Sequence, residues 1–440
     1  MHVYPQTDRL PGEPLRVRWS AAPFALRLLA HGLLLALTGA LTAGLWPLFL
    51  LGIAVWGWPP HQPRPVEIRR VLRAAWTERP PPPGIPPLSR AWLILRVLLR
   101  VTLIPAHGLA WYLDELLYGR RLSATPVVAP LIVLSAARSG STQIARYLEQ
   151  DPRLAAPSMM MSMAPYLWVW PIAAALGRFV SPDVARGLLR RLTTEEFHQR
   201  HEGDPFLTDT LEILFYNLQL RMLAPMLGPR VMSEDFVVAA SAPHNRRFWE
   251  EDFVGYLDRL GRKTLLFSGS DAGGRSKRLF VKGHFLDAAD ALARRYPDAH
   301  FLTVIRAPAS RLHSVLNHLH GNPFDESLGA VPWSWLAACM EDAAVSYCQL
   351  EQRWFTRAEG PARTVVRFTD YVADLEGTMG AVYRSCMGDD TLPAHVPTEH
   401  APRERKNYAV NRTLQQVGID PDALTHRLHE YCAWCRNTPQ

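Results

Sequence analysis

The sequence contains few of the residues that mark several common protein classes. Only five cysteines occur among 440 residues, and the pair Cys432-x-x-Cys435 has no second pair to complete a zinc site. These counts argue against a disulfide framework and a structural zinc site, and free thiols are compatible with a reducing cytoplasm. Lysine is scarce as well, with four positions in a chain rich in arginine: Lys263, Lys277, Lys282 and Lys406.

A strong charge of one sign is also missing, since 48 basic residues stand against 41 acidic ones. This mild excess suits an anionic nucleotide or an anionic membrane surface, and it is too small to predict a nucleic-acid partner. The hydrophobic content of 48% and charged content of 20% are ordinary for a folded protein. The length accommodates one large α/β domain with appendages.

Charged residues are absent from a long run between Gly32 and Trp58. The run exceeds the roughly 20 residues that span a bilayer, so it predicts a membrane segment within a membrane anchor over residues 1–58. We favour a hairpin broken near residues 44–47 over one tilted span, and a buried core helix is a third reading. Arginines flank the run on both sides and leave its orientation open.

Residues 59–124 are expected to connect this anchor to the rest of the chain. Proline tracts at 59–60 and 80–83 predict a semi-rigid spacer with a short basic helix between them. The next stretch, 91–117, predicts a helix with Arg96 and Arg100 on one side. Its apolar face suits either the membrane surface or the surface of the catalytic domain.

The stretch LIVLSAARSGSTQIARYLEQ, residues 131–150, combines an apolar strand, a small polar turn and a helix. The first N–H groups of the helix carry partial positive charge, so an anion is expected above Gly140. No glycine opens the turn and no lysine follows Gly140, so the turn departs from the G-x-x-x-x-G-K-[ST] pattern of nucleoside-triphosphate loops. The further donors expected at this phosphate site are Arg138 and the hydroxyls of Ser139, Ser141 and Thr142.

Strands and helices alternate farther along the chain. The pattern predicts strands over residues 278–282, 301–306 and 364–368, and helices over 286–295 and 310–320. Such alternation predicts a three-layer α/β fold, in which helices cover both faces of a parallel central sheet. Ligands of such sheets bind at the carboxyl ends of the strands, so residues 125–440 are expected to form the catalytic domain.

Two more motifs lie where predicted strands end. Lys282 and His284 are two residues apart in an extended segment, so their side chains lie on one side of it. Arg306 ends the next strand, and Ser314 follows eight residues later inside the predicted helix. Arg311 is a further basic candidate.

The three motifs, in this order, resemble those of sulfotransferases that use 3′-phosphoadenosine-5′-phosphosulfate (PAPS). The resemblance covers residues 128–410 and implies a P-loop-like fold, PAPS as donor, 3′-phosphoadenosine-5′-phosphate as product and no metal. It implies a 5′-phosphosulfate loop at residues 138–142 and a 3′-phosphate site at Arg306 and Ser314. Lys406 lies in a segment similar to the basic one that closes over the nucleotide, and a charged surface turn is its other reading. Ala307 departs from the family pattern, in which aspartate is common.

The resemblance also implies catalytic roles. Lys282 and Arg138 are expected to stabilise charge that grows on the leaving phosphate, and His284 to take the proton of the acceptor hydroxyl. A carboxylate, Glu202 or Asp204, is the substitute base if His284 points away from the acceptor. The expected acceptor is a small molecule or a lipid, with a lipid or lipid-linked glycan hydroxyl favoured by the predicted anchor.

Other interpretations remain for one stretch of the sequence and for the chain as a whole. A stretch rich in methionine and aromatic residues, 159–179, suits either a lipophilic acceptor groove or the core. For the whole chain, the alternatives are a P-loop kinase-like phosphotransferase and a non-catalytic, membrane-anchored protein that binds a nucleotide or lipid. The sulfotransferase reading predicts a membrane-associated enzyme with its catalytic domain in the cytoplasm.

Overall fold

The computed structural model describes residues 21–77, 87–176, 183–184, 187, 204, 206–221, 243–271, 273–319, 333–400 and 412–438. Lys406, Glu202 and the proline tract at 80–83 lie outside these residues.

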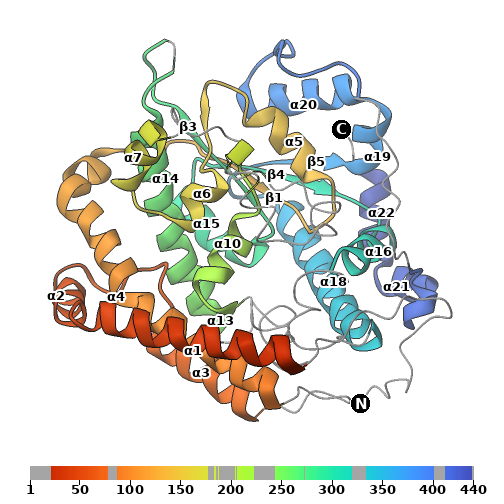
Figure 1. The fold of residues 1–440 in the computed structure, drawn as a ribbon. Helices are drawn as coiled ribbons and strands as arrows, with labels where there is room; N and C mark the ends of the chain where they lie inside the picture. The colour runs from red at the N-terminus through yellow and green to blue at the C-terminus, as the bar shows by residue number, and fades with distance from the viewer. Residues whose placement is uncertain are drawn as a thin grey trace.

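Residues 125–440, which were expected to form the catalytic domain, are called the catalytic half. A five-stranded parallel sheet lies at its centre, in the order β2-β3-β1-β4-β5 (Figure 1). The register pairs Val133 with Lys282 and Leu134 with Gly283. The predicted phosphate loop and the Lys282–His284 motif therefore lie at the ends of neighbouring strands. The three strands predicted downstream are confirmed to within two residues, and β2 is a short addition. The strands are β1 (Leu131–Leu134), β2 (Leu154–Ala155), β3 (Arg278–Gly283), β4 (His300–Ile305) and β5 (Ala362–Arg367).

Alternate residues of the strands enter two different hydrophobic cores. Ile132 and Val281 face one core, which includes Phe215 and Trp249, whereas Leu131, Val133, Phe280 and Val304 face a second core. Each strand therefore needs apolar residues on both faces, as expected for a parallel sheet between helical layers. The predicted three-layer α/β fold is confirmed.

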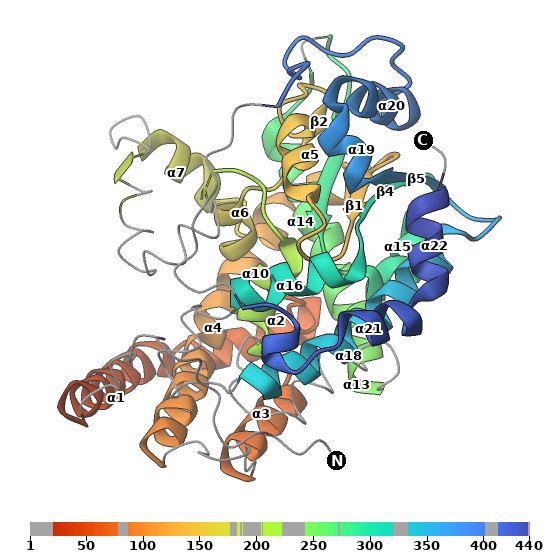
Figure 2. The ribbon, with the colours of Figure 1, turned by 90° about the vertical axis from the view of Figure 1, so that its right-hand side faces the viewer.

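Helices cover both faces of the sheet and continue beyond its edge (Figures 1 and 2). Short 3₁₀ turns occur at Leu286–Ala288 and Gln415–Val417, and a π-helical segment spans Phe248–Phe253. The α-helices of the catalytic half are α5 (Ser141–Leu148), α6 (Met159–Met163), α7 (Val169–Leu176), α10 (Leu211–Leu218), α13 (Pro243–Arg247), α14 (Val254–Ser268), α15 (Ala289–Arg295), α16 (Pro308–Leu319), α18 (Trp333–Phe355), α19 (Phe368–Ala373), α20 (Leu375–Met387), α21 (Pro421–Arg427) and α22 (His429–Asn437).

Four helices precede the sheet: α1 (Ala21–Ala43), α2 (Trp46–Trp56), α3 (Pro65–Thr77) and α4 (Pro87–Ala124). The apolar run is broken as predicted, because α1 and α2 meet at residues 44–45 with a bend of 64°. By length and composition, Leu93–Ala124 of α4 could cross a membrane, and the bent pair α1–α2 could form one further span.

The structure decides where α4 lies, because this helix is fastened to the catalytic half by buried polar contacts. Lys263 of α14 pairs with Asp114 of α4 at 2.8 Å, and both side chains are fully buried. The Asp114 carboxylate also accepts hydrogen bonds from the backbone N–H groups of Leu167 and Trp168. Of the two locations open to α4, packing on the catalytic domain is therefore the one observed.

Residues of the expected anchor and linker share the main hydrophobic core with the catalytic half. Phe49 of α2 and Trp111 and Tyr112 of α4 belong to the same buried cluster as Phe253 of the π-helical segment. The domain limits at residues 58 and 124 stay a prediction, and they do not coincide with a gap in this core.

Candidate active site

The loop after β1 is built by contacts that join three strands. The Ser135 N–H donates to the Gly283 carbonyl at 3.2 Å, and the Ser135 hydroxyl accepts from the Val304 N–H at 2.8 Å. The loop then turns through Gly140 at φ +96°, a conformation that favours glycine. A Cβ atom on Gly140 would lie 2.7 Å from the Phe368 ring, so no larger residue fits without a shift.

A buried hydroxyl in this loop has no partner. The side chain of Ser139 is fully buried, and its Oγ atom makes no hydrogen bond. Buried polar atoms are nearly always paired, so this hydroxyl is open to a hydrogen bond from outside the protein, to a water molecule or to a bound anion. Helix α5 begins two residues later at Ser141, as predicted, and no side chain caps its first turn. The loop therefore has the donors of an anion site.

Three predicted phosphate ligands lie together at the end of β4. Arg306 donates to the Arg138 carbonyl at 2.9 Å, and Arg138 Nε donates to the Ser314 hydroxyl at 3.0 Å. The Arg306 guanidinium lies 4.4 Å from the centre of the Phe368 ring. Burial, followed by the charges of Arg138 and Arg311, lowers the pKa of Arg306. An anion bound between Arg138 and Arg306 would relieve this repulsion.

Lys282 reaches the loop from β3. Its Nζ atom donates to the Thr142 hydroxyl at 2.9 Å and to the Thr210 hydroxyl at 3.4 Å, and it lies 4.0 Å from the Asp209 carboxylate. Burial lowers the pKa of Lys282, and the two nearby carboxylates, Asp209 and Glu212, oppose that effect. The Lys282 amine is thus a desolvated cation beside the first turn of α5. It has no short ion pair with the Asp209 carboxylate, which lies 4.0 Å away.

His284 is held in one tautomer. Its Nδ1 atom lies 2.5 Å from the Ser135 carbonyl, which can only accept, so Nδ1 carries the proton. Nε2 is left with a lone pair. Burial, together with the charge of Lys282, lowers the pKa of His284 to about 3. The imidazole is therefore neutral at physiological pH, with Nε2 able to accept a proton.

Glu212 is a site residue that the sequence motifs did not indicate. It lies at the start of α10, is almost fully buried, and its Oε2 atom has no hydrogen-bond partner. This oxygen lies so close to Gly283, between Lys282 and His284, that a Cβ atom at that position would collide with it. Burial raises the pKa of Glu212 to about 7. The available signal was a charged residue inside the apolar run LEILF.

Two other candidates from the sequence, Asp204 and Arg311, make contacts within the protein. Asp204 accepts a hydrogen bond from the Phe206 N–H at 2.9 Å. Arg311 is almost fully buried and donates to Glu351 at 3.2 Å, while Glu351 also accepts from Tyr431 at 2.6 Å. This network ties α16 to α18 and α22, and it accounts for the charge of Arg311 without a phosphate.

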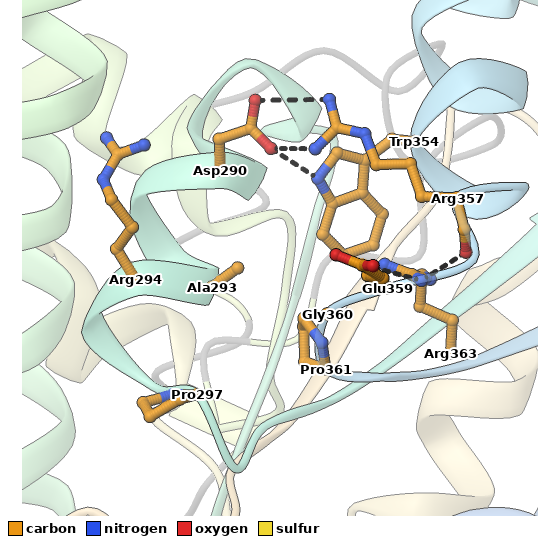
Figure 3. A pocket seen from close by; sticks show the side chains of 10 residues that line it. All are labelled: Asp290, Ala293, Arg294, Pro297, Trp354, Arg357, Glu359, Gly360, Pro361 and Arg363. Atoms are coloured by element: carbon orange, nitrogen blue, oxygen red, sulfur yellow. Dashed lines mark hydrogen bonds and ion pairs between the residues drawn. The ribbon is translucent and has the colours of Figure 1, made fainter.

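A pocket of about 370 Å³ lies at the opposite edge of the sheet, near the amino end of β5. Figure 3 shows Asp290 paired with Arg357, and the Trp354 indole donates to the same carboxylate at 3.0 Å. The predicted motifs lie at the carboxyl ends of the strands, so this pocket is separate from the candidate site.

Comparisons with known proteins bear on the family and the fold of this chain. A sequence model of a group described as a sulfotransferase family matches residues 130–389. No curated protein sequence matches the chain. The structure resembles the sulfotransferase STF9 from Mycobacterium avium, with TM-score 0.59, 19% identity and coverage of 88% of this chain and 95% of that one.

The sulfotransferase STF1 from Mycobacterium tuberculosis H37Rv is similar too, with TM-score 0.54, 16% identity and coverage of 87% of this chain and 98% of that one. The two structures cover 88% and 87% of this chain, which is more than residues 130–440 make up. The likeness of fold therefore includes part of the four N-terminal helices. From the match over more than half of its length, the chain belongs to the sulfotransferase family.

Proposed function

We propose that this sulfotransferase moves a sulfuryl group from PAPS to a hydroxyl group of an acceptor. The observation that carries the proposal is the buried, unpartnered hydroxyl of Ser139 in a loop flanked by Arg138 and Lys282. A hydroxyl in this position is satisfied when an anionic oxygen accepts its hydrogen bond.

The residues divide into two groups for the two phosphate-bearing ends of the donor. Arg306 and Ser314 would hold the 3′-phosphate, and their contacts with Arg138 join this group to the loop. Lys406 stays a proposed ligand from the part of the chain outside the described residues. The proposed ligands of the 5′-phosphosulfate are Arg138, Ser139, Gly140, Ser141 and Thr142.

PAPS would supply the sulfuryl group and a phosphate as the leaving group. Lys282 and Arg138 would lower the energy of negative charge that develops on the leaving oxygen, because a desolvated cation acts strongly at short range. His284 would accept the acceptor's proton at Nε2, with its ring held by the Ser135 carbonyl. Anionic donor groups near the ring favour its protonated form and would raise its low pKa during turnover.

The acceptor in this proposal is a small molecule or a lipid, and we favour a hydroxyl of a membrane lipid or lipid-linked glycan. Support comes from the leucines exposed on α1 and α2, which suit a lipid environment. The protein would be membrane-associated, with its catalytic half in the cytoplasm.

The test uses the full-length protein in detergent with sulfur-35-labelled PAPS and a lipid extract. Label transferred to an organic-phase product, and lost with His284→Ala, is the expected result. Independently, 3′-phosphoadenosine-5′-phosphate should raise the melting temperature and adenosine 5′-phosphate should do so far less, because only the first carries a 3′-phosphate. Equal shifts by the two nucleotides would reject Arg306 and Ser314 as a 3′-phosphate site.

A further inference from the structure

The helix α1 has two different faces. One face lies along α4, where the hydroxyls of Thr38 and Thr102 are 3.0 Å apart and Leu28 packs against the cluster of α3 and α4. The other face is an unbroken apolar stripe, spaced by four residues and therefore on one side of the helix. The side chains of the stripe are between 57% and 69% exposed: Leu29, Leu33, Leu37 and Leu41.

The same division continues in α2. Its inner side is Phe49 and Gly52, which pack so closely on α4 that a Cβ atom at Gly52 would collide with the Tyr112 ring. Away from α4 it again exposes apolar residues, Leu48, Leu50, Leu51 and Val55. The combined surface of α1 and α2 is far more apolar than the scattered exposed leucines of a water-soluble protein.

A bilayer cannot surround α1 on all sides, because polar elements are fixed behind it. Helix α4 lies directly behind α1, and α3 packs on α4 through Val71 and Ala74. The outer side of α3 exposes Arg69, Arg73 and Trp76. If α1 crossed the membrane, these arginines would enter hydrocarbon together with it, which is strongly unfavourable.

Helix α4 cannot separate from the catalytic half to avoid this conflict. The buried pair of Lys263 and Asp114, and a second ion pair between Arg259 and Glu115, attach α4 to α14. Leaving these contacts would strand buried charges. Only the outer faces of α1 and α2 are therefore free to contact lipid.

We propose that α1 and α2 bind one leaflet of a phospholipid membrane from the side, with their outer leucines among the acyl chains, and that the chain does not cross the bilayer. This inference rests on the proposed membrane association and specifies its mode. Arg69, Arg73 and Trp76, on the neighbouring helix, are of the types found at lipid headgroups, so the partner is an anionic leaflet. Binding of this kind presents an acceptor from the same leaflet that holds the enzyme.

The first experiment measures flotation of the full-length protein with phosphatidylcholine vesicles that contain phosphatidylglycerol. Leu33→Asp with Leu37→Asp should weaken binding by about tenfold or more, since each leucine loses its burial and a charge is added. The matched control is Val128→Asp with Val372→Asp, which alters exposed valines outside α1 and α2 and should float normally. Arg69→Ala with Arg73→Ala should reduce the preference for anionic vesicles.

The second experiment decides between lateral binding and crossing of the bilayer by the bent α1–α2 pair as one span. Cysteines introduced by His2→Cys and Thr77→Cys lie before α1 and at the end of α3, on either side of the α1–α2 pair in sequence. A membrane-impermeant maleimide outside sealed vesicles should label both. Protection of one position alone overturns lateral binding and leaves membrane association intact.

Two further outcomes would also overturn the inference. No flotation at all would reject the membrane as partner, without touching donor transfer, which is assayed separately. A dimer in lipid-free solution that dissociates with Leu33→Asp and Leu37→Asp would assign the apolar face to a second copy of the chain.

Discussion

The carboxyl group of Glu212 allows a quantitative check of the electrostatics behind the Lys282–His284 segment. It is buried against Gly283, with one oxygen unpartnered, and burial raises its pKa from an ordinary 4.5 to about 7. Glu212→Gln keeps the size of the side chain and removes its titration. The substitution therefore isolates the cost of placing a negative charge here.

The magnitude follows from the two pKa values. Each pKa unit corresponds to about 1.4 kcal/mol, so the ionised form is disfavoured in the folded state by about 3 kcal/mol. Between pH 4.5 and 7 the folded state retains a proton that the unfolded state has released. The free energy of unfolding of the wild type therefore falls as pH rises through this window, and the Gln variant lacks this contribution. The free energy of unfolding of the variant minus that of the wild type should therefore increase by about 3 kcal/mol between pH 4 and pH 8.

Urea unfolding of the full chain, followed by tryptophan fluorescence at several pH values, measures this difference. Contributions from titrating groups distant from Glu212 cancel because both proteins contain them. Glu376→Gln, at an exposed position on α20, is the matched control for the substitution of a glutamate by glutamine. A difference between Glu212→Gln and wild type that stays constant from pH 4 to pH 8 would refute the argument that this carboxyl is desolvated.

Three further expectations concern the site and its support. His284→Ala should bind 3′-phosphoadenosine-5′-phosphate within a few-fold of wild type while turnover falls by about 10²–10⁴, and near-normal turnover would move suspicion to a carboxylate. Arg306→Ala should lose the melting-temperature advantage of that nucleotide over adenosine 5′-phosphate, whereas Arg363→Ala, at the other end of the sheet region, should keep it. Lys263→Met should destabilise the protein by about 3–5 kcal/mol in denaturant unfolding, because Asp114 would be left as a buried unpaired charge, and adding Asp114→Leu should recover part of that loss.

The parts of the site that could be predicted are those in which sequence order and strand ends coincide. Arg138 and Arg306 follow apolar strands and Lys282 is the last residue but one of β3, and parallel pairing brings the ends of β1, β3 and β4 to one edge. Knowing that the sheet is parallel was therefore sufficient to expect these cations near one another. Their partners were not predictable in this way, and the direction of Arg138 toward Ser314 is a product of side-chain packing.

Glu212 illustrates the limit of reading motifs. The residue lies seventy positions before Lys282 in the chain, and it has no fixed spacing to any motif. Only the packing of α10 against the end of β3 brings the carboxyl to Gly283. The location of α4 was undecided for a similar reason: its apolar face is equally suited to lipid and to protein, and the pairing of Asp114 with Lys263 depends on tertiary structure.

The glycine between Lys282 and His284 connects these observations. A side chain at Gly283 would collide with the Glu212 carboxylate and the Phe285 ring, so the segment can place Lys282 against α5 and His284 against Ser135 only when the middle residue is glycine. Gly283→Ala would have to displace Glu212 or the strand end, and it would shift the amine and the imidazole together. The two catalytic candidates thus depend on one backbone position, and the buried carboxylate that restricts it also acts, after that of Asp209, to raise the pKa of Lys282.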